Sequence, residues 1–294
     1  MKSLVDYAAL FTEHTLRLAR NVNVYYREAN PNGRRTIIVV HGITGTHYSM
    51  LQAAGVWAEA GDHVIAIDLP GHGKSDPIAI RSFHDLADWL HEVIEKVYPE
   101  GDYILMGNSF GSNVCAGYAS IYGLRGGSSM VLGAPIPSIN RVLRSIERLT
   151  ATLPNRLTLR IYYANRAVEP LRMMVLLGQQ KNQEARKMLR ESIRSEGPLV
   201  RHRYAFGHLM PHYYAYDPYS RELPDDVACR TIAVIGEKDR VAGRTSIRAM
   251  QRWLGDDRVK RVPHSGHLVH IEAVPELTEA IALSQNGHRR HHKI

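Results

Sequence analysis

The sequence has little cysteine, with only two among 294 residues. Cys115 falls inside a predicted buried helix and Cys229 falls just before a predicted strand. This arrangement offers neither a disulfide framework nor the paired spacing of a zinc site. Because 44% of the residues are hydrophobic, we expect a large apolar core in place of covalent cross-links, in one or two domains.

The sequence also lacks long hydrophobic runs. No stretch approaches the roughly 18 uninterrupted apolar residues that a transmembrane helix needs. Asp6 and Glu13 interrupt the N-terminal stretch, which has neither the apolar segment nor the small-residue cleavage site of a signal peptide. We therefore expect a cytoplasmic protein.

Positive charge is unevenly distributed. The net charge is +8, and residues 138–220 carry fourteen Lys and Arg against six Asp and Glu. A second basic run, rich in His and Arg, begins at Gly287. Such patterns are typical of solvated helix faces. We expect no nucleic-acid partner and at most weak contact with an anionic membrane surface.

Short apolar, β-branched runs alternate with helical stretches along most of the chain. The runs are 36–40, 64–67, 103–106, 130–132 and 231–235, and residues 14–29 resemble two strands around a turn at Arg20 and Asn21. The predicted helices are a short N-terminal one, 82–97 with Ser82 as N-cap, 111–122, 244–254 and 275–283. This alternation predicts a parallel sheet with helices on both faces.

The alternation stops between Pro135 and Pro224. This stretch contains no convincing strand, and its predicted helical segments lie near 138–150, 156–167, 169–179, 182–195 and 199–209. We interpret it as a helical insertion that could cover the strand ends. The predicted organisation is a core of residues 1–135 and 223–284, a helical cap of residues 136–222, and a basic disordered tail of residues 285–294.

The strongest motif is Gly107-Asn108-Ser109-Phe110-Gly111, a G-x-S-x-G. It directly follows a predicted strand and precedes a predicted helix, which is the context of a nucleophilic serine on a strained turn. Larger residues in place of the two glycines would collide with neighbouring backbone. The motif predicts Ser109 as a nucleophile whose hydroxyl lies near a helix N-terminus.

A serine nucleophile needs a general base, and the base needs a carboxylate. We predict His267 as the base, because it follows the last predicted strand in a Gly-His loop; His264 and His270 are local alternatives. Asp239 lies in the loop after the strand 231–235 and is the predicted carboxylate. Glu237 is its competitor, and the order Ser, Asp, His favours Asp239.

Acyl chemistry also needs hydrogen-bond donors for a developing oxyanion. The backbone N–H of Phe110 is one expected donor, and that of Ile43, in the loop His41–Gly45, is the other. His41 precedes a glycine at a strand end, so we expect it to have a structural hydrogen-bonding role. His208 and His212 have a metal-like spacing, but no third ligand accompanies them. No metal or other cofactor is expected.

Together these motifs resemble the α/β-hydrolase superfamily, in its capped, serine-nucleophile branch. The resemblance covers residues 14–284 and includes His41-Gly42, the segment Asp68–Ser75, the serine motif, Gly236–Asp239 and Ser265–His267. It implies a mostly parallel eight-stranded sheet with a helical cap after strand 6, a Ser109–His267–Asp239 triad and an acyl-enzyme. It also implies that Asp68–Ser75 is a structural turn. Serine at position 109 argues against the dehalogenases and epoxide hydrolases of this family, which use Asp.

The substrate is less defined than the reaction. The primary hypothesis is hydrolysis of a carboxylic ester, thioester or lactone in a small-molecule acyl substrate. One alternative is a carbon–carbon bond hydrolase of the meta-cleavage type. The segment Gly107-Asn108-Ser109 resembles the nucleophile turn of that group, but the loop His41–Gly45 departs from its glycine-rich oxyanion loop. The other is a non-enzymatic ligand receptor on the same fold. Apolar and aromatic residues of the cap could line a pocket or form its core: Met173, Met174, Leu176, Leu177, Tyr204, Phe206, Tyr213 and Tyr214.

Overall fold

The computed structural model contains one eight-stranded sheet in the order β1-β2-β4-β3-β5-β6-β7-β8. It describes residues 2–19, 21–137, 169–179, 182–196, 204–215 and 217–291, and residues 145, 149, 152, 153 and 157. The strands are β1 (Thr12–Arg17), β2 (Asn23–Ala29), β3 (Thr36–Val40), β4 (His63–Ile67), β5 (Tyr103–Asn108), β6 (Ser129–Gly133), β7 (Thr231–Gly236) and β8 (Val259–Val262). β2 pairs antiparallel with β1 and β4, and the other pairs are parallel. The predicted sheet is confirmed.

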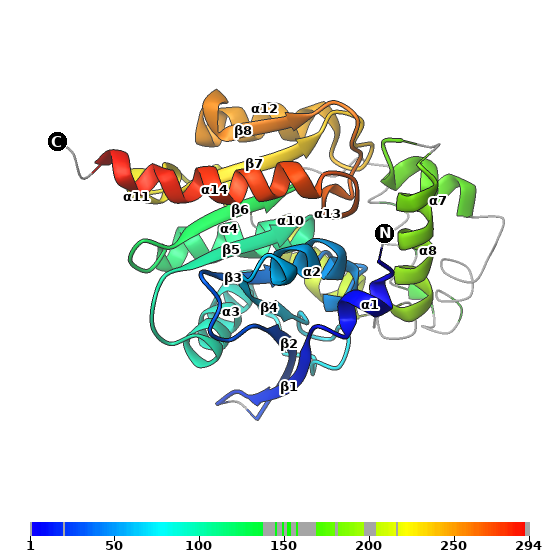
Figure 1. The fold of residues 1–294 in the computed structure, drawn as a ribbon, viewed down its shortest axis with the longest axis horizontal. Helices are drawn as coiled ribbons and strands as arrows, with labels where there is room; N and C mark the ends of the chain where they lie inside the picture. The colour runs from blue at the N-terminus through cyan, green and yellow to red at the C-terminus, as the bar shows by residue number, and fades with distance from the viewer. Residues whose placement is uncertain are drawn as a thin grey trace.

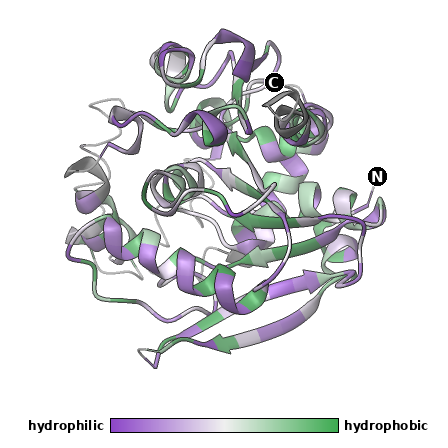
Figure 2. Ribbon diagram, turned by 90° about the vertical axis from the view of Figure 1, so that its left-hand side faces the viewer, coloured by the Kyte–Doolittle hydropathy of each residue, from purple (hydrophilic) through white to green (hydrophobic). Residues whose placement is uncertain are grey.

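Helices cover both faces of the sheet, as Figure 1 shows. α3 (His84–Val97), α4 (Phe110–Tyr122) and α12 (Gly243–Leu254) pack on one face and share an apolar cluster with the strands. α1 (Leu4–Ala8), α2 (Leu51–Glu59), α13 (Val269–Glu272) and α14 (Val274–His291) lie on the other face with a second cluster. Central strands are largely hydrophobic along their length, whereas the helices alternate hydrophobic and hydrophilic residues (Figure 2).

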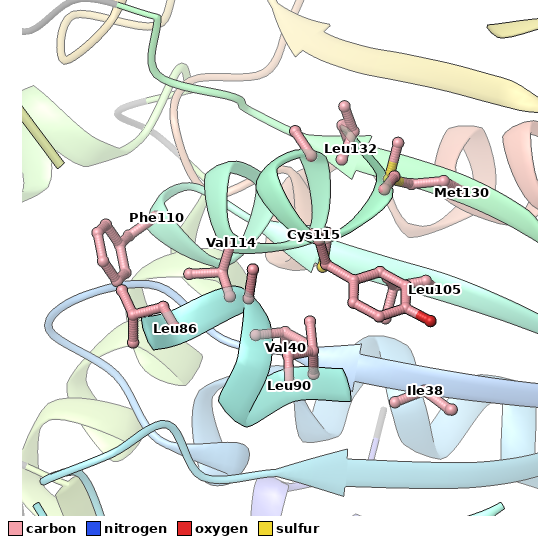
Figure 3. Packing of buried hydrophobic residues seen from close by; sticks show 14 of the residues in the cluster. Ile38, Val40, Leu86, Leu90, Leu105, Phe110, Val114, Cys115, Met130 and Leu132 are labelled. Atoms are coloured by element: carbon pink, nitrogen blue, oxygen red, sulfur yellow. The ribbon is translucent and has the colours of Figure 1, made fainter. Parts of the chain in front are cut away.

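The packing under α4 determines where the serine motif sits. Phe110 and Val114 of α4 are fully buried, as are Leu86 and Leu90 of α3. Figure 3 shows these side chains meeting strand residues such as Val40. Burying an aliphatic or aromatic side chain of this size stabilises a fold by about 1.5–3 kcal/mol. The first turn of α4 is therefore anchored to the sheet on which Ser109 stands.

Four short helices connect the larger elements. They are η1 (His47–Met50), η5 (Pro218–Ser220), α11 (Asp225–Ala228) and η6 (Asp256–Arg258). Within the part of the chain that the structure describes, no helix combines the length and the apolar character that crossing a membrane would require.

Several predicted boundaries differ from the structure. Ser82 does not cap α3, which begins at His84; Asp85 Oδ2 accepts the N–H groups of Arg81 and Ser82 instead. α2 was not predicted, because almost all of it is buried and it has no polar stripe. α14 continues to His291, so it includes residues 285–291 of the segment predicted as a tail. The tail sequence contains no proline, so nothing in it forces the helix to end.

The stretch between β6 and β7, residues 136–222, is called the insertion below. Its described elements are α7 (Glu169–Leu176), α8 (Gln183–Glu196), η4 (Ala205–Leu209), α10 (Met210–Ala215) and the short helix η5. The predicted segments 169–179, 182–195 and 199–209 overlap these helices, whereas 138–150 and 156–167 lie almost entirely outside the described residues. Pro211 is the second residue of α10, and η4, a π-helical turn, runs without a break into this helix.

The described part of the insertion packs on the core partly through its apolar side chains and through Tyr204. Its apolar cluster, which includes Met173 and Leu177, also contains Ile271 of α13. The hydroxyl of Tyr204 exchanges hydrogen bonds with the backbone of Ile78 at 3.1 and 2.8 Å. These contacts place Met173, Leu177 and Tyr204 in packing roles, whereas Met174 is exposed.

Candidate active site

The carboxyl ends of the parallel strands meet at one edge of the sheet. Ser109 follows β5 directly, and the loop His41–Gly45 follows β3. Asp239 follows β7, and His267 comes after β8. Such an edge is where α/β sheets place their ligands, and four segments far apart in sequence converge there.

Ser109 occupies a strained turn between β5 and α4. Its φ of 56° and ψ of −120° lie outside the regions that L-residues favour. A Cβ on Gly107 would lie 2.5 Å from the Gly111 carbonyl oxygen, and one on Gly111 would lie 2.3 Å from that of Val40. Both motif positions therefore require glycine because backbone passes directly against them.

Hydrogen bonds from Ser109 and Ser112 stabilise the turn that carries the nucleophile. The N–H of Ser109 donates to the Gly133 carbonyl at 2.8 Å. The Ser112 hydroxyl lies 2.9 Å from the Gly107 carbonyl and 2.8 Å from the Gly133 carbonyl. Ser112 was not singled out from the sequence, since a serine in a helix has many roles. These bonds join the nucleophile to β6 as well as to β5.

The three predicted triad residues form one hydrogen-bonded chain. His267 Nε2 lies 2.8 Å from Ser109 Oγ, and His267 Nδ1 lies 2.8 Å from Asp239 Oδ2. All three residues are less than 8% exposed. A donor–acceptor distance of 2.8 Å is a good hydrogen bond. The geometry suits proton transfer from the serine hydroxyl to an imidazole that a carboxylate orients.

Asp239 is held in its ionised form. Burial by itself would raise the pKa of its carboxyl, but His267 and two backbone N–H groups outweigh burial and hold the pKa below its ordinary value. Those N–H groups, from Val241 and Ala242, donate to Oδ1 at 2.7 and 3.1 Å. Oδ2 is thereby left to His267.

The residues considered as alternatives to Asp239 and His267 lie outside the hydrogen-bonded triad. Glu237 forms an ion pair with Arg261. His264 is half-exposed and lies 3.6 Å from a carboxylate oxygen of Glu276. His270 is buried beside His267, and burial together with His267 lowers its pKa to about 3. None of the three contacts Ser109.

The loop His41–Gly45 lies against the nucleophile. A Cβ on Gly42 would be 3.2 Å from the Cβ of Ser109. The Gly42 carbonyl accepts the N–H of Gly45 at 3.0 Å and lies 2.7 Å from His41 Nδ1. In a trans peptide the N–H points opposite to the carbonyl. These two bonds therefore fix the direction of the Ile43 N–H, which belongs to the same peptide unit.

His41 has the structural role that its position predicts. Its Nε2 accepts the N–H of Leu69 at 2.9 Å, so the proton is on Nδ1 and is donated to Gly42. Burial, with a further contribution from His72, lowers the pKa of His41 to about 3. The ring is therefore neutral near pH 7 and keeps a single tautomer.

The segment Asp68–Ser75 forms a buried turn beside this loop. Asp68 Oδ1 accepts the backbone N–H of His47 at 2.7 Å and lies 2.9 Å from His47 Nδ1. His72 Nε2 lies 2.7 Å from the carbonyl of Ile43. The turn thus supports the loop His41–Gly45 from behind and does not reach the nucleophile.

Metal ligation has no support among the described residues, where no group of three or more His, Cys, Asp or Glu could hold an ion. His208 lies in η4 and His212 in α10. His208 stacks on Tyr204 at a centroid separation of 5.8 Å. Ring packing accounts for His208 without a ligand.

Comparisons with known proteins concern the family and the fold. A family model described as alpha/beta hydrolase fold matches residues 35–274. The chain is 29% identical over 112 residues to 2-succinyl-6-hydroxy-2,4-cyclohexadiene-1-carboxylate synthase of Shigella dysenteriae, covering 38% of this chain and 43% of the relative. It is 26% identical over 141 residues to proline iminopeptidase of Saccharolobus solfataricus, covering 46% and 44%. The matched regions thus span less than half of these relatives.

Solved structures match over the whole fold. An esterase from Exiguobacterium antarcticum superposes with a TM-score of 0.69 at 14% identity, covering 94% of this chain and 100% of that one. At this identity the match concerns the fold. The sheet and its helices are therefore shared with an experimentally determined hydrolase structure.

Proposed function

We propose that this chain, which belongs to the alpha/beta hydrolase fold family, is a serine hydrolase that cleaves a carboxylic ester, thioester or lactone through an acyl-enzyme. The observation that carries the proposal is the buried chain from Ser109 Oγ through the His267 ring to Asp239, with both contacts at 2.8 Å. A structural serine would not need a base and an ionised carboxylate aligned in this way.

In the proposed mechanism, His267 Nε2 takes the Ser109 proton as Oγ attacks the substrate carbonyl. Asp239 stabilises the imidazolium that forms and keeps the ring oriented. His267 then protonates the leaving group, and a water molecule repeats the sequence to release the acid. The low pKa of Asp239 supports this role, because the carboxylate has to stay ionised while His267 gains its proton.

The proposed oxyanion donors are the N–H groups of Ile43 and Phe110. Phe110 is the first residue of α4, where the helix dipole favours negative charge. The peptide that carries the Ile43 N–H is oriented by His41 and Gly45 and lies next to the nucleophile through Gly42. Losing one such donor typically lowers kcat by about 10²–10³-fold.

The test is a panel of p-nitrophenyl esters of increasing acyl length with wild type and Ser109→Ala. We expect turnover of at least one ester by wild type and a loss of about 10⁴-fold or more in the variant. Equal, slow hydrolysis of every ester by both proteins would contradict the esterase function. Cleavage of a vinylogous diketone without ester turnover would instead favour the carbon–carbon hydrolase.

A further inference from the structure

Glu272, the last residue of α13, binds backbone from two segments that are nearly ninety residues apart in sequence. Its Oε1 accepts the N–H of Gln179 at 3.0 Å, and its Oε2 accepts the N–H of Gly266 at 2.8 Å. The N–H of Gly178 lies 2.9 Å from Oε2 and 3.1 Å from Oε1. One carboxylate thus joins the end of α7 in the insertion to the residue that precedes His267.

The two segments also touch directly, backbone to backbone. A Cβ on Gly178 would lie 2.4 Å from the nitrogen of Gly266, and one on Gly266 would lie 2.5 Å from the nitrogen of Gly178. Real Cβ atoms do not approach other atoms so closely. The contact is therefore possible only because both positions are glycine.

The insertion also holds His267 itself. The N–H of His267 donates to the carbonyl of Leu176 at 2.9 Å. A guanidinium nitrogen of Arg240, the residue after Asp239, donates to the carbonyl of Met174. Main-chain atoms at the end of α7 therefore contact the loops of both His267 and Asp239.

We propose that Glu272 is a positioning residue for His267: it fastens the loop of the base to the insertion, so that the insertion sets the geometry of the base. This inference rests on the proposed hydrolase function. The carboxylate of Glu272 accepts hydrogen bonds from the backbone N–H groups of Gly178, Gln179 and Gly266. Hydrogen bonds from N–H groups to a carboxylate are shorter and stronger than neutral ones.

A carboxylate suits this role better than an amide does. Both oxygens accept here, one toward the insertion and one toward the loop of His267. Glutamine has one acceptor oxygen, and its NH₂ group would face N–H donors. Glu272→Gln therefore keeps the size of the side chain but loses one of the two attachments.

The first test measures amide hydrogen exchange by mass spectrometry in wild type, Glu272→Gln and the control Glu279→Gln. Glu279 is on α14 and forms an exposed ion pair with Lys260 of β8, and it has no hydrogen bond to residues 176–179 or 264–268 among the described residues. We expect peptides containing residues 176–179 and 264–268 to exchange about tenfold faster in Glu272→Gln alone. Unchanged exchange in either segment would overturn the attachment, whether or not the enzyme is active.

The second test measures kcat and KM with the best ester, and the rate at which a fluorophosphonate labels Ser109. We expect kcat and the labelling rate to fall about 10- to 100-fold in Glu272→Gln, with KM within twofold, because an error of about 1 Å in placing the base costs roughly 10²-fold. Gly178→Ala, which pushes the same contact apart, should reproduce this kcat effect. Wild-type kcat in Glu272→Gln would overturn the positioning role.

The two tests separate the proposals. If wild type neither hydrolyses esters nor labels at Ser109, the hydrolase function fails, and hydrogen exchange still decides the attachment. If wild type is active and Glu272→Gln matches it in both exchange and kcat, the positioning role fails and the hydrolase function stands.

Discussion

The nucleophile and the base of this site are held by different kinds of structure. Ser109 stands on core elements alone, with its N–H on the Gly133 carbonyl and glycines packed against backbone on both sides. His267 takes its main-chain support from Leu176 of the insertion and, through Gly266, from Glu272. We call Ser109 and the residues that support it the serine arm, and His267 with Asp239 and the residues that support them the histidine arm. The nucleophile is therefore fixed by the sheet and its helices alone, whereas the base also depends on a segment added to them.

The largest expected effect on kcat comes from the substitution Asp239→Asn in the histidine arm. An amide in place of the carboxylate leaves the His267 tautomer unfixed and its imidazolium unsupported, so kcat should fall by about 10⁴-fold. Steady-state ester kinetics measure the loss.

Glu237→Gln is the matched control for Asp239→Asn. It lies two residues earlier in the same loop and forms a surface ion pair with Arg261, so kcat should stay within twofold. If both variants lost activity equally, Asp239 would not be the carboxylate of the triad.

A substitution in the turn that carries Ser109 should lower the stability of the protein as well as its catalytic rate. In Gly111→Ala the new Cβ would meet the carbonyl oxygens of Val40 and His41 at 2.3 and 2.5 Å. We expect the free energy of unfolding to fall by about 3 kcal/mol in urea titrations, the upper part of the range for overpacking.

Gly61→Ala provides the comparison for Gly111→Ala. Its φ is +84°, but a Cβ there meets nothing within 4 Å. It should therefore lose only about 1–2 kcal/mol from left-handed backbone strain. Equal losses in the two variants would show that the glycines of the serine turn are not required by close packing.

A loss of stability should also appear at acid pH, through His270 next to the base. His270, on α13, is 3% exposed, and burial with the nearby His267 lowers its pKa from 6.5 to about 3. Unfolding lets it bind a proton that the folded state refuses. Its contribution to stability is therefore complete above pH 6.5 and is lost as pH falls toward 3. At pH 4 the loss is roughly 3 kcal/mol.

Replacing His270 with leucine should remove the loss of stability at low pH that this histidine causes. Urea unfolding between pH 7 and pH 4 should show a flatter dependence in His270→Leu than in wild type. His264 is half-exposed, so His264→Gln should keep the wild-type slope. A wild-type slope in His270→Leu would mean that this histidine is not buried in its neutral form.

Much of the serine arm could be predicted from the sequence, and much of the histidine arm could not. The runs that became β3, β5 and β7 are apolar because these strands are buried on both faces, and the G-x-S-x-G pattern reports a steric need at two positions. The residues that follow these strands then meet at one edge. This is why Ser109 and Asp239 could be predicted as candidates, whereas His267 was predicted from its Gly-His loop and from the order Ser, Asp, His.

The support of the histidine arm leaves little trace in the sequence. Glu272 accepts hydrogen bonds from backbone N–H groups, which every residue except proline carries. The sequence therefore contains no characteristic partner residue from which its role could be predicted. Gly178 resembles any loop glycine until the backbone of Gly266 is seen against it. β8 is short and has a polar interior, Val-Lys-Arg-Val, at the sheet edge, and it was missed for the same lack of pattern.

Covalent labelling tests most directly whether Ser109 is a nucleophile that His267 activates. Wild type, Ser109→Ala and His267→Ala would be treated with a fluorophosphonate, and the adduct located by peptide mass spectrometry. We expect one stoichiometric adduct on Ser109 in wild type, none in Ser109→Ala, and labelling slowed by at least about 10³-fold in His267→Ala. No adduct in wild type, or equal labelling of wild type and His267→Ala, would contradict the activation of Ser109 by His267.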